Sequence, residues 1–485
     1  MNVMLHCPLP PVQDWPSWLR HLLSERFSGR QQLLLARITR PLSPALLRHV
    51  TAYADAVLVP TELADMVKLP AEDLLVYASE EDLASRLPAF IQRRTECAQR
   101  EVLWTDPDII MRSPAMKPLV LNALKLVQER GWRIRLWCQQ TTLPPEMFRT
   151  DLMPKTGLHW VFNLMCFAPQ VTWRQFMWWL LRGRRPARLV HACGPGFVHA
   201  DMTTVHFINW AWCKTLATRL LRPAVIPHIL VSCYSALIEL IYFRWFRPDL
   251  LLAVGRGVAR GLQKIAGDTA RVGVLPSSYD EQEFHPGRRE VDRRKMRSHW
   301  GFRDDTYVLA FAAQGGYERK GFYILASALE ALWEQGQRSF RVLLLGGSKD
   351  GIKRLQEDLA ARFPHHTEWL MIAGWVESLA EAMAAADAFV FPSYFESFAA
   401  VEAEACALGL PLALTPHWGS EMVLRPGENG VSLPWDVPGI AAALLELRQR
   451  TSEWKSILPE ATPLSQYGER LHQLYTEALA AKNHS

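Results

Sequence analysis

The sequence predicts an α/β protein with two Rossmann-like domains that face each other across a cleft, preceded by an extra N-terminal α/β segment. From Val102 onward, short apolar strand-like runs alternate with helical patterns, which is typical of βαβ units and a parallel sheet. A second series of the same kind begins after a basic stretch at 287–297. The length agrees, because 485 residues at about 150 residues per domain leave room for roughly three folding units.

The first series predicts one domain. A helix is expected at 117–130, because the apolar residues from Leu119 to Val127 fall on one stripe. Before this domain, strand-like runs at 32–36 and 56–59 surround a helical segment at 43–54, and the sequence assigns this part no function. The strands of the first series are predicted at 102–105, 132–138, 188–192, 203–207 and 250–254.

The second series predicts another domain, and two such domains in tandem bind ligands between the carboxyl ends of their strands. The basic stretch is interpreted as an interdomain linker with solvated arginines. A final helical pattern at 465–481 is expected to pack back across the domain junction. The strands are predicted at 307–312, 341–345, 369–373, 388–391 and 411–414. The expected units are 1–95, 96–286, 287–460 and 461–485.

Composition excludes several classes of protein. Lys plus Arg number 54 against 49 Asp plus Glu, a net charge of +5 that is small for a nucleic-acid binder. With 49% hydrophobic and 21% charged residues, the chain can form a packed interior. The 8 cysteines show no C-x-x-C pair and resemble reduced core residues. The N-terminus lacks the pattern of a secretory signal, so a cytoplasmic location is expected.

Two segments bear on membrane contact. The apolar stretch at 224–246 is interrupted by Pro227, Glu239 and Arg244, so we expect a long, largely buried helix and no span. The segment at 173–185 has aromatic and leucine residues followed by arginines. It fits an interfacial membrane helix or a core helix with a basic C-terminal end, and the second interpretation is favoured because one aromatic stripe is weak evidence.

The first motif with chemical meaning follows the strand at 307–312 and reads Gln-Gly-Gly-Tyr-Glu-Arg-Lys-Gly. Gly315 and Gly316 would let the backbone approach a ligand, and the N-terminus of the following helix would offer N–H groups to an anion. Arg319 and Lys320 add two cations, which makes a diphosphate the natural ligand. A surface turn with a basic pair is the alternative.

The second motif, at 391–406, combines a strand end, a loop and the start of a helix. Glu396 lies in the loop, and a helix that begins near Phe398 would place Glu404 on an apolar face. An unpaired buried charge is expensive, so Glu404 needs partners, which ribose hydroxyls could supply. In the alternative interpretation Glu396 lies in the first helical turn, Glu402 is solvated and Glu404 is hydrogen-bonded within the core.

Together these motifs resemble glycosyltransferase family 4. Its donor domain carries two glutamates separated by seven residues in a Pro-Ser-x-x-Glu-Gly-Phe-Gly context, which corresponds to Pro392, Ser393, Glu396, Phe398 and Glu404. It also carries a Lys-Gly after a glycine-bearing loop, as at Lys320 and Gly321. Further matches lie at Gly374, 386–393, 409–411, 421–423 and 427–431, and weaker ones at 204–206 and 273–286.

The resemblance implies the GT-B fold and a retaining glycosyltransferase that uses a nucleotide-diphosphate sugar, such as a UDP- or GDP-sugar, without a metal or another cofactor. It assigns Arg319 and Lys320 to the diphosphate, Glu404 to the ribose and His206 to the acceptor side. The sugar would be held by Glu396 and by backbone N–H groups of Ser397, Phe398 and Ala399.

Two departures from the family pattern leave the donor open. Ser397 and Ala399 stand where the family usually has glycines, and residues 112–115 replace its Gly-Gly after the first strand. Bacterial members of the family often build envelope glycans on lipid-linked acceptors, so such an acceptor and peripheral contact with the inner membrane face are expected partners. Two alternatives remain open: a metal-dependent GT-A transferase that uses Asp106 and Asp108, and an inactive nucleotide-binding scaffold subunit.

Overall fold

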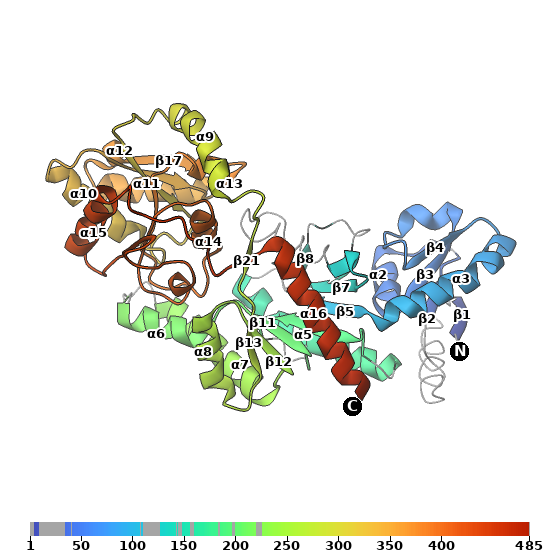
Figure 1. Cartoon of the computed structure of the whole chain (residues 1–485). Helices are drawn as coiled ribbons and strands as arrows, with labels where there is room; N and C mark the ends of the chain where they lie inside the picture. Colours follow the sequence, from blue (N-terminus) through green and yellow to red (C-terminus); the bar gives the residue numbers. More distant parts are fainter. Residues whose placement is uncertain are drawn as a thin grey trace.

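The computed structural model describes residues 4–8, 34–39, 41–106, 108–109, 127–141, 143, 148–155, 160–182, 185–195, 199–219 and 226–484. Within these residues the chain forms three larger parallel sheets, of 4, 7 and 6 strands (Figure 1). The 7- and 6-stranded sheets belong to two Rossmann-like domains, and the 4-stranded sheet belongs to the N-terminal segment. The predicted fold class is therefore confirmed.

The N-terminal unit lies at one end of the molecule, beside the seven-stranded sheet (Figure 1). Its strands pair in sequence order, as the parallel crossovers allow. The strands are β1 (Met4–Pro8), β2 (Leu34–Arg37), β3 (Ala56–Pro60) and β4 (Leu74–Tyr77), and the helices are α2 (Pro44–Tyr53), η2 (Thr61–Met66) and α3 (Glu80–Gln99).

The seven-stranded sheet has the order β13-β12-β11-β10-β5-β7-β9, so the strand order reverses between β5 and β10. Of the helix predicted at 117–130, residues 127–129 are helical, and 110–126, including 112–115, lie outside the described residues. The strands are β5 (Glu101–Thr105), β7 (Arg133–Cys138), β9 (Arg149–Leu152), β10 (Leu189–Cys193), β11 (Met202–Val205), β12 (Leu250–Ala253) and β13 (Val272–Val274). A short pair, β6 (Asp108–Ile109) and β8 (Gln140–Thr141), lies beside them.

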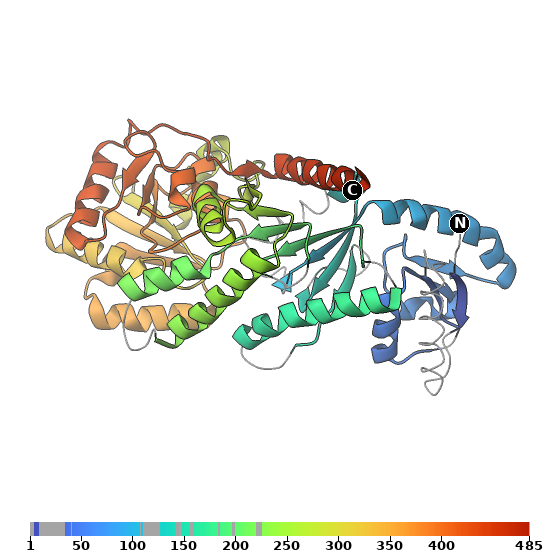
Figure 2. The same cartoon turned by 90° about the horizontal axis from the view of Figure 1, so that it is seen from below.

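Helices cover both faces of this sheet. Figure 2 shows α16 (Leu464–His484) along one face and α5 (Trp160–Arg182) along the other. Alternate residues of each strand serve the two layers, so Val102 packs with Leu471 of α16, whereas Leu103 packs with Trp178 of α5. Three more helices, α6 (Asn209–Arg219), α7 (Ile226–Trp245) and α8 (Arg256–Ala266), complete this domain.

The six-stranded sheet has the order β17-β16-β15-β18-β19-β20, which is the doubly wound Rossmann order with its reversal between β15 and β18. Its strands are β15 (Tyr307–Ala312), β16 (Phe340–Leu345), β17 (Leu370–Gly374), β18 (Ala388–Phe391), β19 (Leu412–Leu414) and the unpredicted β20 (Gly430–Ser432). Its helices include α10 (Phe322–Glu334), α11 (Lys349–Arg362), α12 (His366–Trp369), α13 (Leu379–Met383), α14 (Ala400–Ala407), η4 (Ser420–Met422) and α15 (Val437–Gln449).

The basic stretch is not a linker, contrary to the prediction. Residues Pro286–His299 form helix α9, which packs against α13 of the six-stranded domain. Arg293 and Arg297 both pair with Asp387, the latter at 3.1 Å, and the same carboxylate accepts the backbone N–H of Val308 at 2.7 Å. The arginines therefore hold the helix to the start of β18. The number of charged residues in the sequence does not reveal this structural role.

The chain crosses between the two Rossmann-like domains twice, and the two crossings pair with each other. Ser278–Tyr279 forms β14 and Thr462–Pro463 forms β21, which together make a short parallel ladder. Beyond β21, Glu281 accepts the backbone N–H of Leu464 at 2.8 Å and so caps the start of α16. The junction is thus held by backbone pairing as well as by side chains.

A buried ionic network joins the N-terminal unit to the seven-stranded sheet. Asp73, just before β4, pairs with Arg94 at 3.2 Å and with Arg149 at 3.3 Å, and it also contacts Arg133. Arg94 and Arg133 each lie 3.5 Å from Glu101. The side chains of all five residues are almost completely buried, so each charge depends on its partners within the network.

Arginines of the seven-stranded sheet also bind the C-terminal end of α2. Arg149 donates to the carbonyl oxygen of Thr51 in the last turn of α2 and to those of Ala54 and Asp55 just beyond it, and Arg135 donates to that of Ala52 at 2.7 Å. The last carbonyls of a helix lack partners within the helix and carry partial negative charge, so guanidinium groups satisfy them well. These contacts fix the N-terminal unit on the sheet.

The Asp73→Asn variant is expected to lose about 3–5 kcal/mol of unfolding free energy, because removing one partner leaves buried arginines without their counter-charge. Urea unfolding followed by circular dichroism measures the change. The control is Asp305→Asn, which breaks an exposed pair with Arg303 and should cost less than about 1 kcal/mol. Equal, small losses for both variants would contradict the role of the network.

Candidate functional site

The two motif loops meet at the point where the strand order of the six-stranded sheet reverses. One loop follows β15 and the other follows β18, which is where doubly wound sheets bind their ligands. Gly321 has a φ of 73°, and a Cβ at this position would lie 1.8 Å from the carbonyl oxygen of Pro392. The loops are tied together because the carbonyl of Arg319 accepts the N–H of Tyr394 at 2.9 Å and the hydroxyl of Ser393 at 3.2 Å.

The contact between the loops brings the predicted cation and carboxylate together. The Arg319 Nη1 atom donates to Glu396 Oε1 at 2.7 Å and to the carbonyl oxygen of Phe395 at 2.7 Å. Both side chains are mostly shielded, with 29% and 13% of their surface exposed. A partly buried, charge-assisted bond of this kind fixes the direction of both groups. Arg319 and Glu396 therefore form one ion pair of fixed geometry.

Lys320 provides a cation that is free of direct ion pairs in the described part of the chain. Its Nζ atom lies 5.4 Å from the centre of the Phe391 ring. Burial lowers the pKa of Lys320, and the nearby Glu396 carboxylate acts in the opposite direction. A desolvated ammonium group next to an open loop is well placed to bind an anion.

The glycine loop and the start of α10 both supply free backbone donors. The N–H groups of Gly321 and Phe322 donate to the carbonyl oxygens of Glu318 and Tyr317, whereas those of Tyr323 and Ile324, in the first turn of α10, have no acceptor among the described residues. Among the hydrogen bonds of the described residues, none uses the N–H of Gly315 or Gly316. No atom of the described residues lies within 4 Å of a Cβ built on either glycine. The open donors therefore lie both in the loop and in the first turn of α10.

The second loop presents another group of backbone donors. Helix α14 begins at Ala400 with Ala399 as its N-cap, two residues later than expected, and no side chain caps it. In the described structure the N–H groups of Ser397, Phe398 and Ala399 have no acceptor. The buried Ser397 hydroxyl also lacks a partner among these residues. The loop can therefore donate to oxygen atoms of a ligand.

Glu404 is buried in α14, as predicted, with 4% of its surface exposed. Its Oε2 atom has no hydrogen-bond partner in the described part of the protein. Burial raises the pKa of the carboxyl to about 8, and the nearby Glu283 carboxylate adds to this shift. A buried polar atom without a partner is expensive, so this carboxyl group is suited to a ligand that brings hydroxyl donors.

Glu402 is not solvated, contrary to the alternative interpretation of the motif. It is fully buried, and its Oε1 atom lies 2.9 Å from Nε2 of His417. Burial raises the pKa of Glu402, while His417 acts against the shift. Burial also acts to lower the pKa of His417, but the facing carboxylate outweighs it and raises that pKa. Sequence reasoning missed His417, because no local spacing links it to Glu402.

His206 lies in the other Rossmann-like domain, directly after β11. Burial lowers the pKa of His206 to about 4, so the imidazole is neutral near pH 7. The next residue, Phe207, packs its ring on Phe395 with the centroids 5.1 Å apart. The structure thus brings the strand end with His206 to the residue that precedes Glu396.

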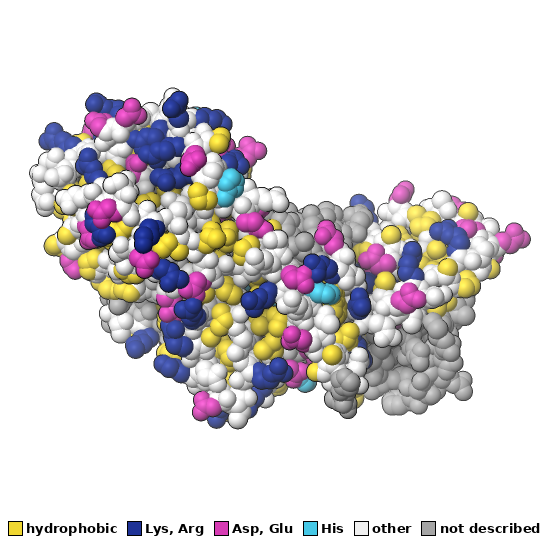
Figure 3. Space-filling view, in the orientation of Figure 1, with side chains coloured by type: hydrophobic (Ala, Val, Ile, Leu, Met, Phe, Trp, Pro, Cys, Tyr) yellow, Lys and Arg dark blue, Asp and Glu magenta, His cyan; other side chains and the backbone are white. Residues whose placement is uncertain are grey.

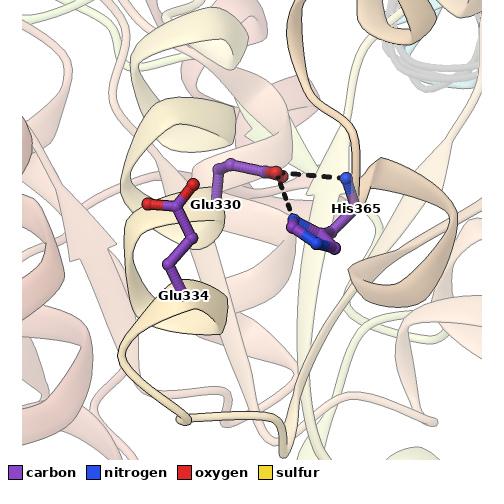
Figure 4. Close-up of side chains that lie close together, drawn as sticks. All are labelled: Glu330, Glu334 and His365. Carbon is purple, nitrogen blue, oxygen red and sulfur yellow. Dashed lines mark hydrogen bonds and ion pairs between the residues drawn. The ribbon is translucent and has the colours of Figure 1, made fainter.

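A separate group of Glu330, Glu334 and His365 lies outside this site (Figure 4). Glu330 accepts hydrogen bonds from the N–H of His365 at 3.1 Å and from Nε1 of Trp369 at 2.8 Å, and its Oε1 atom lies 2.7 Å from His365 Nδ1. These bonds tie α10 to the segment around α12. These hydrogen bonds explain how the Glu330 carboxylate can be buried, and no bound ligand is needed to explain it.

The surface has mixed charge, and two of its helices expose large apolar side chains. Figure 3 shows basic and acidic side chains interspersed across the visible face, in keeping with the small net charge. Helix α7 exposes Leu230 at 66% and Leu237 at 52%, so it is not largely buried as predicted. Helix α5 exposes Trp173 at 64% and Phe176 at 45%. Among the described residues, no helix combines the length and apolar character needed to cross a bilayer.

Comparison with known sequences connects the six-stranded domain to a family. Residues 306–450 match the family described as glycosyl transferases group 1. A D-inositol 3-phosphate glycosyltransferase from Actinosynnema mirum is 32% identical over 204 residues, which cover 40% of this chain and 44% of that protein. The chain therefore spans less than half of the length of this relative.

Solved structures extend the likeness to both Rossmann-like domains. WaaG, a glycosyltransferase involved in lipopolysaccharide biosynthesis, superposes with a TM-score of 0.56 at 16% identity, over 78% of this chain and 98% of WaaG. Anabaena Alr3699/HepE in complex with UDP-glucose gives a TM-score of 0.54 at 15% identity, over 79% and 100%. This fold rules out the GT-A alternative suggested by Asp106 and Asp108. Residues 306–450 thus match the glycosyl transferases group 1 family, within a chain that has the GT-B fold.

Proposed function

We propose that the protein is a retaining glycosyltransferase of the family 4 type that transfers a hexosyl group from a UDP- or GDP-sugar. The observation that carries this proposal is the meeting of Arg319, Lys320 and Glu396 at the strand-order reversal of a group 1 domain. The buried Glu404, with an oxygen that lacks a partner among the described residues, supports a ribose site on the same domain. The acceptor is an envelope glycan or a lipid-linked precursor.

The diphosphate would bind where the structure offers positive charge and free donors. Arg319 and Lys320 supply the charge, and the open N–H groups of Gly315 and Gly316 supply hydrogen bonds. As the bond to the sugar breaks, negative charge develops on the leaving diphosphate. Preorganised donors and cations stabilise that charge without moving, and in many enzymes this stabilisation accounts for most of the rate enhancement.

The sugar and ribose would lie on the second loop. Glu396, held by Arg319, accepts sugar hydroxyls, and the N–H groups of 397–399 donate to sugar oxygens. Glu404 accepts the ribose hydroxyls, which satisfies its buried carboxyl. His206, neutral near pH 7, approaches from the acceptor side and can accept a proton there.

The relatives support the donor and acceptor classes. The HepE structure holds UDP-glucose, which favours a UDP-sugar. WaaG is involved in lipopolysaccharide biosynthesis, and LpsE of Rhizobium meliloti is a lipopolysaccharide core biosynthesis glycosyltransferase, so both favour an envelope glycan. The competing assignment is an inactive nucleotide-binding scaffold. It requires nucleotide binding with neither sugar transfer nor donor hydrolysis.

Contact with a membrane surface follows from the apolar faces of α5 and α7. Figure 2 shows these helices along the same side of the molecule, opposite α16. Trp173, Phe176 and Leu230 project from them into solvent, and Arg182 ends α5. Aromatic side chains followed by a basic residue suit the boundary between lipid headgroups and acyl chains. A lipid-linked acceptor at the cytoplasmic face of the inner membrane would then lie within reach.

The Lys320→Ala and Glu396→Ala variants are expected to fold but to lose transfer. Loss of a preorganised charge at the reacting centre should lower kcat by roughly 10²–10³-fold. Release of UDP or GDP from the corresponding nucleotide-sugars measures turnover. Lys353→Ala, which removes an exposed lysine of α11, is the matched control. Normal turnover by either site variant would show that these residues do not carry the reaction.

The Glu404→Gln variant is expected to bind nucleotide more weakly and to change how stability depends on pH. Ribose hydroxyl donors would favour the ionised form of the Glu404 carboxyl, which Gln cannot adopt, so UDP or GDP binding should weaken by about 1–3 kcal/mol, as measured by calorimetry. Burial raises the pKa of this carboxyl to about 8, so the folded chain keeps a proton that the unfolded chain releases. Stability of the natural protein should therefore fall as the pH rises from about 5 toward 8, and the Gln variant should escape that loss.

A 2′,3′-dideoxy nucleoside diphosphate provides the control for this variant. Because it lacks the ribose hydroxyls, its affinity should be equal for the natural protein and for Glu404→Gln. If the variant weakens both nucleotides alike, Glu404 supports the domain and does not contact ribose.

Replacing the exposed aromatic residues of α5 is expected to reduce membrane binding. The Trp173→Ser/Phe176→Ser variant should bind phosphatidylglycerol-containing vesicles at least about tenfold more weakly, because each ring contributes its apolar area. Vesicle flotation measures this. The control, Val291→Ser/Leu458→Ser, removes equally exposed apolar residues elsewhere. Equal binding by all three proteins would contradict the docking surface.

A further inference from the structure

We infer that Phe395 and Trp418 are positioning residues that couple the contact between the two Rossmann-like domains to the carboxylate of Glu396. The inference rests on the assignment of Glu396 to the donor sugar. Phe395 and Trp418 belong to the six-stranded domain, yet both pack in an apolar cluster formed mainly by residues of the seven-stranded domain. They flank the backbone of Glu396 from two directions.

The Phe395 ring is enclosed by aromatic side chains from across the junction. It lies edge-on to Phe207 with 5.1 Å between centroids, and 5.8 Å from Trp212 of α6. Trp418 closes the cluster from its own domain at 5.6 Å from Phe395. Only 5% of the Phe395 surface remains exposed. Aromatic pairs at these separations attract one another beyond the effect of burial alone.

Trp418 lies against two glycines of α8. A Cβ at Gly257 would lie 2.3 Å from the indole, and a Cβ at Gly261 would lie 3.1 Å from it. The two positions are four residues apart and so share one face of the helix. Both glycines are buried, although glycine is unfavourable within a helix. Their absent side chains leave the space that the indole occupies.

Each ring is linked to Glu396 by a short path. Phe395 is its neighbour in the chain, and its carbonyl oxygen accepts the same Arg319 Nη1 that binds the Glu396 carboxylate. Trp418 precedes Gly419, whose N–H donates to the carbonyl oxygen of Glu396 at 3.1 Å. When the seven-stranded domain holds both rings, it therefore also holds the peptide that carries the carboxylate.

The coupling has a consequence for the reaction. The Arg319–Glu396 pair is internal to the six-stranded domain, so a nucleotide can bind there without the second domain. The orientation of the Glu396 peptide, however, depends on rings that the second domain encloses. Glu396 should reach its working position only when the two domains are in contact, which links sugar orientation to the arrival of the acceptor side.

The first test uses hydrogen exchange on the ligand-free full chain. Trp418→Ala and Gly257→Ala should both speed exchange of the hydrogen-bonded amides of Tyr394 and Gly419 by about tenfold, since each loses the ring contact. Gly257→Ala gives the more decisive test, because the substitution is in the seven-stranded domain and the change in exchange is measured in the six-stranded domain. Trp333→Ala, at the far end of α10, is the control and should leave these amides unchanged.

The second test uses turnover with UDP-glucose and GDP-mannose. Trp418→Ala should lower kcat by roughly 10- to 100-fold with little change in donor KM, and Trp418→Phe should recover most of the loss. Binding of UDP or GDP should be nearly unchanged. A merely structural role would instead lower thermal stability and nucleotide binding together, and Phe would not restore turnover selectively.

The outcomes separate this inference from the proposed function. If no nucleotide-sugar is consumed by the natural protein but the exchange pattern appears, the proposed function fails and the coupling stands. If transfer occurs but neither variant changes exchange at Tyr394 and Gly419, the coupling is wrong and the proposed function stands. A uniform rise in exchange across the whole chain would also overturn the coupling.

Discussion

At Gly321 the backbone passes so close to the carbonyl oxygen of Pro392 that any side chain would separate the two loops beyond β15 and β18. The contact lets the carbonyl of Arg319 bind the second loop while its guanidinium reaches Glu396. The positions of the charged groups thus follow from a backbone approach that glycine alone permits. The open N–H groups of the glycine loop then face the same region.

The six-stranded domain could be predicted closely because its information is local. Buried strands of a parallel sheet appear as short apolar runs, and motif spacing sets which loops follow them. The strands of the six-stranded sheet agree with the prediction to within a residue or two, except β20, whose sequence Gly-Val-Ser has too few apolar residues to form an apolar run. The burial of Glu404 followed from its place on one helical face. These features need no knowledge of distant parts of the chain.

Other features depend on contacts between distant segments. The arginines of α9 appeared to be solvated, because their partner Asp387 lies far along the chain. The burial of Glu402 was also not predicted, because its partner His417 lies in another segment of the chain. The buried arginines around Asp73 are also hidden in a count of charges, although they hold the N-terminal unit in place. Burial of a charge is decided by its partner, and pairing across a fold leaves no periodic trace in the sequence.

The paired crossings β14 and β21 have a mechanical consequence. Because the two connecting segments are paired side by side, they act as one hinge between the Rossmann-like domains (Figure 1). A hinge of this kind allows the domains to rotate and resists sliding of one past the other. The relative position of the domains is then described mainly by one hinge angle. For a given hinge rotation, the displacement of an atom grows with its distance from the hinge. Small rotations at the crossings therefore become large separations between surfaces that lie far from them.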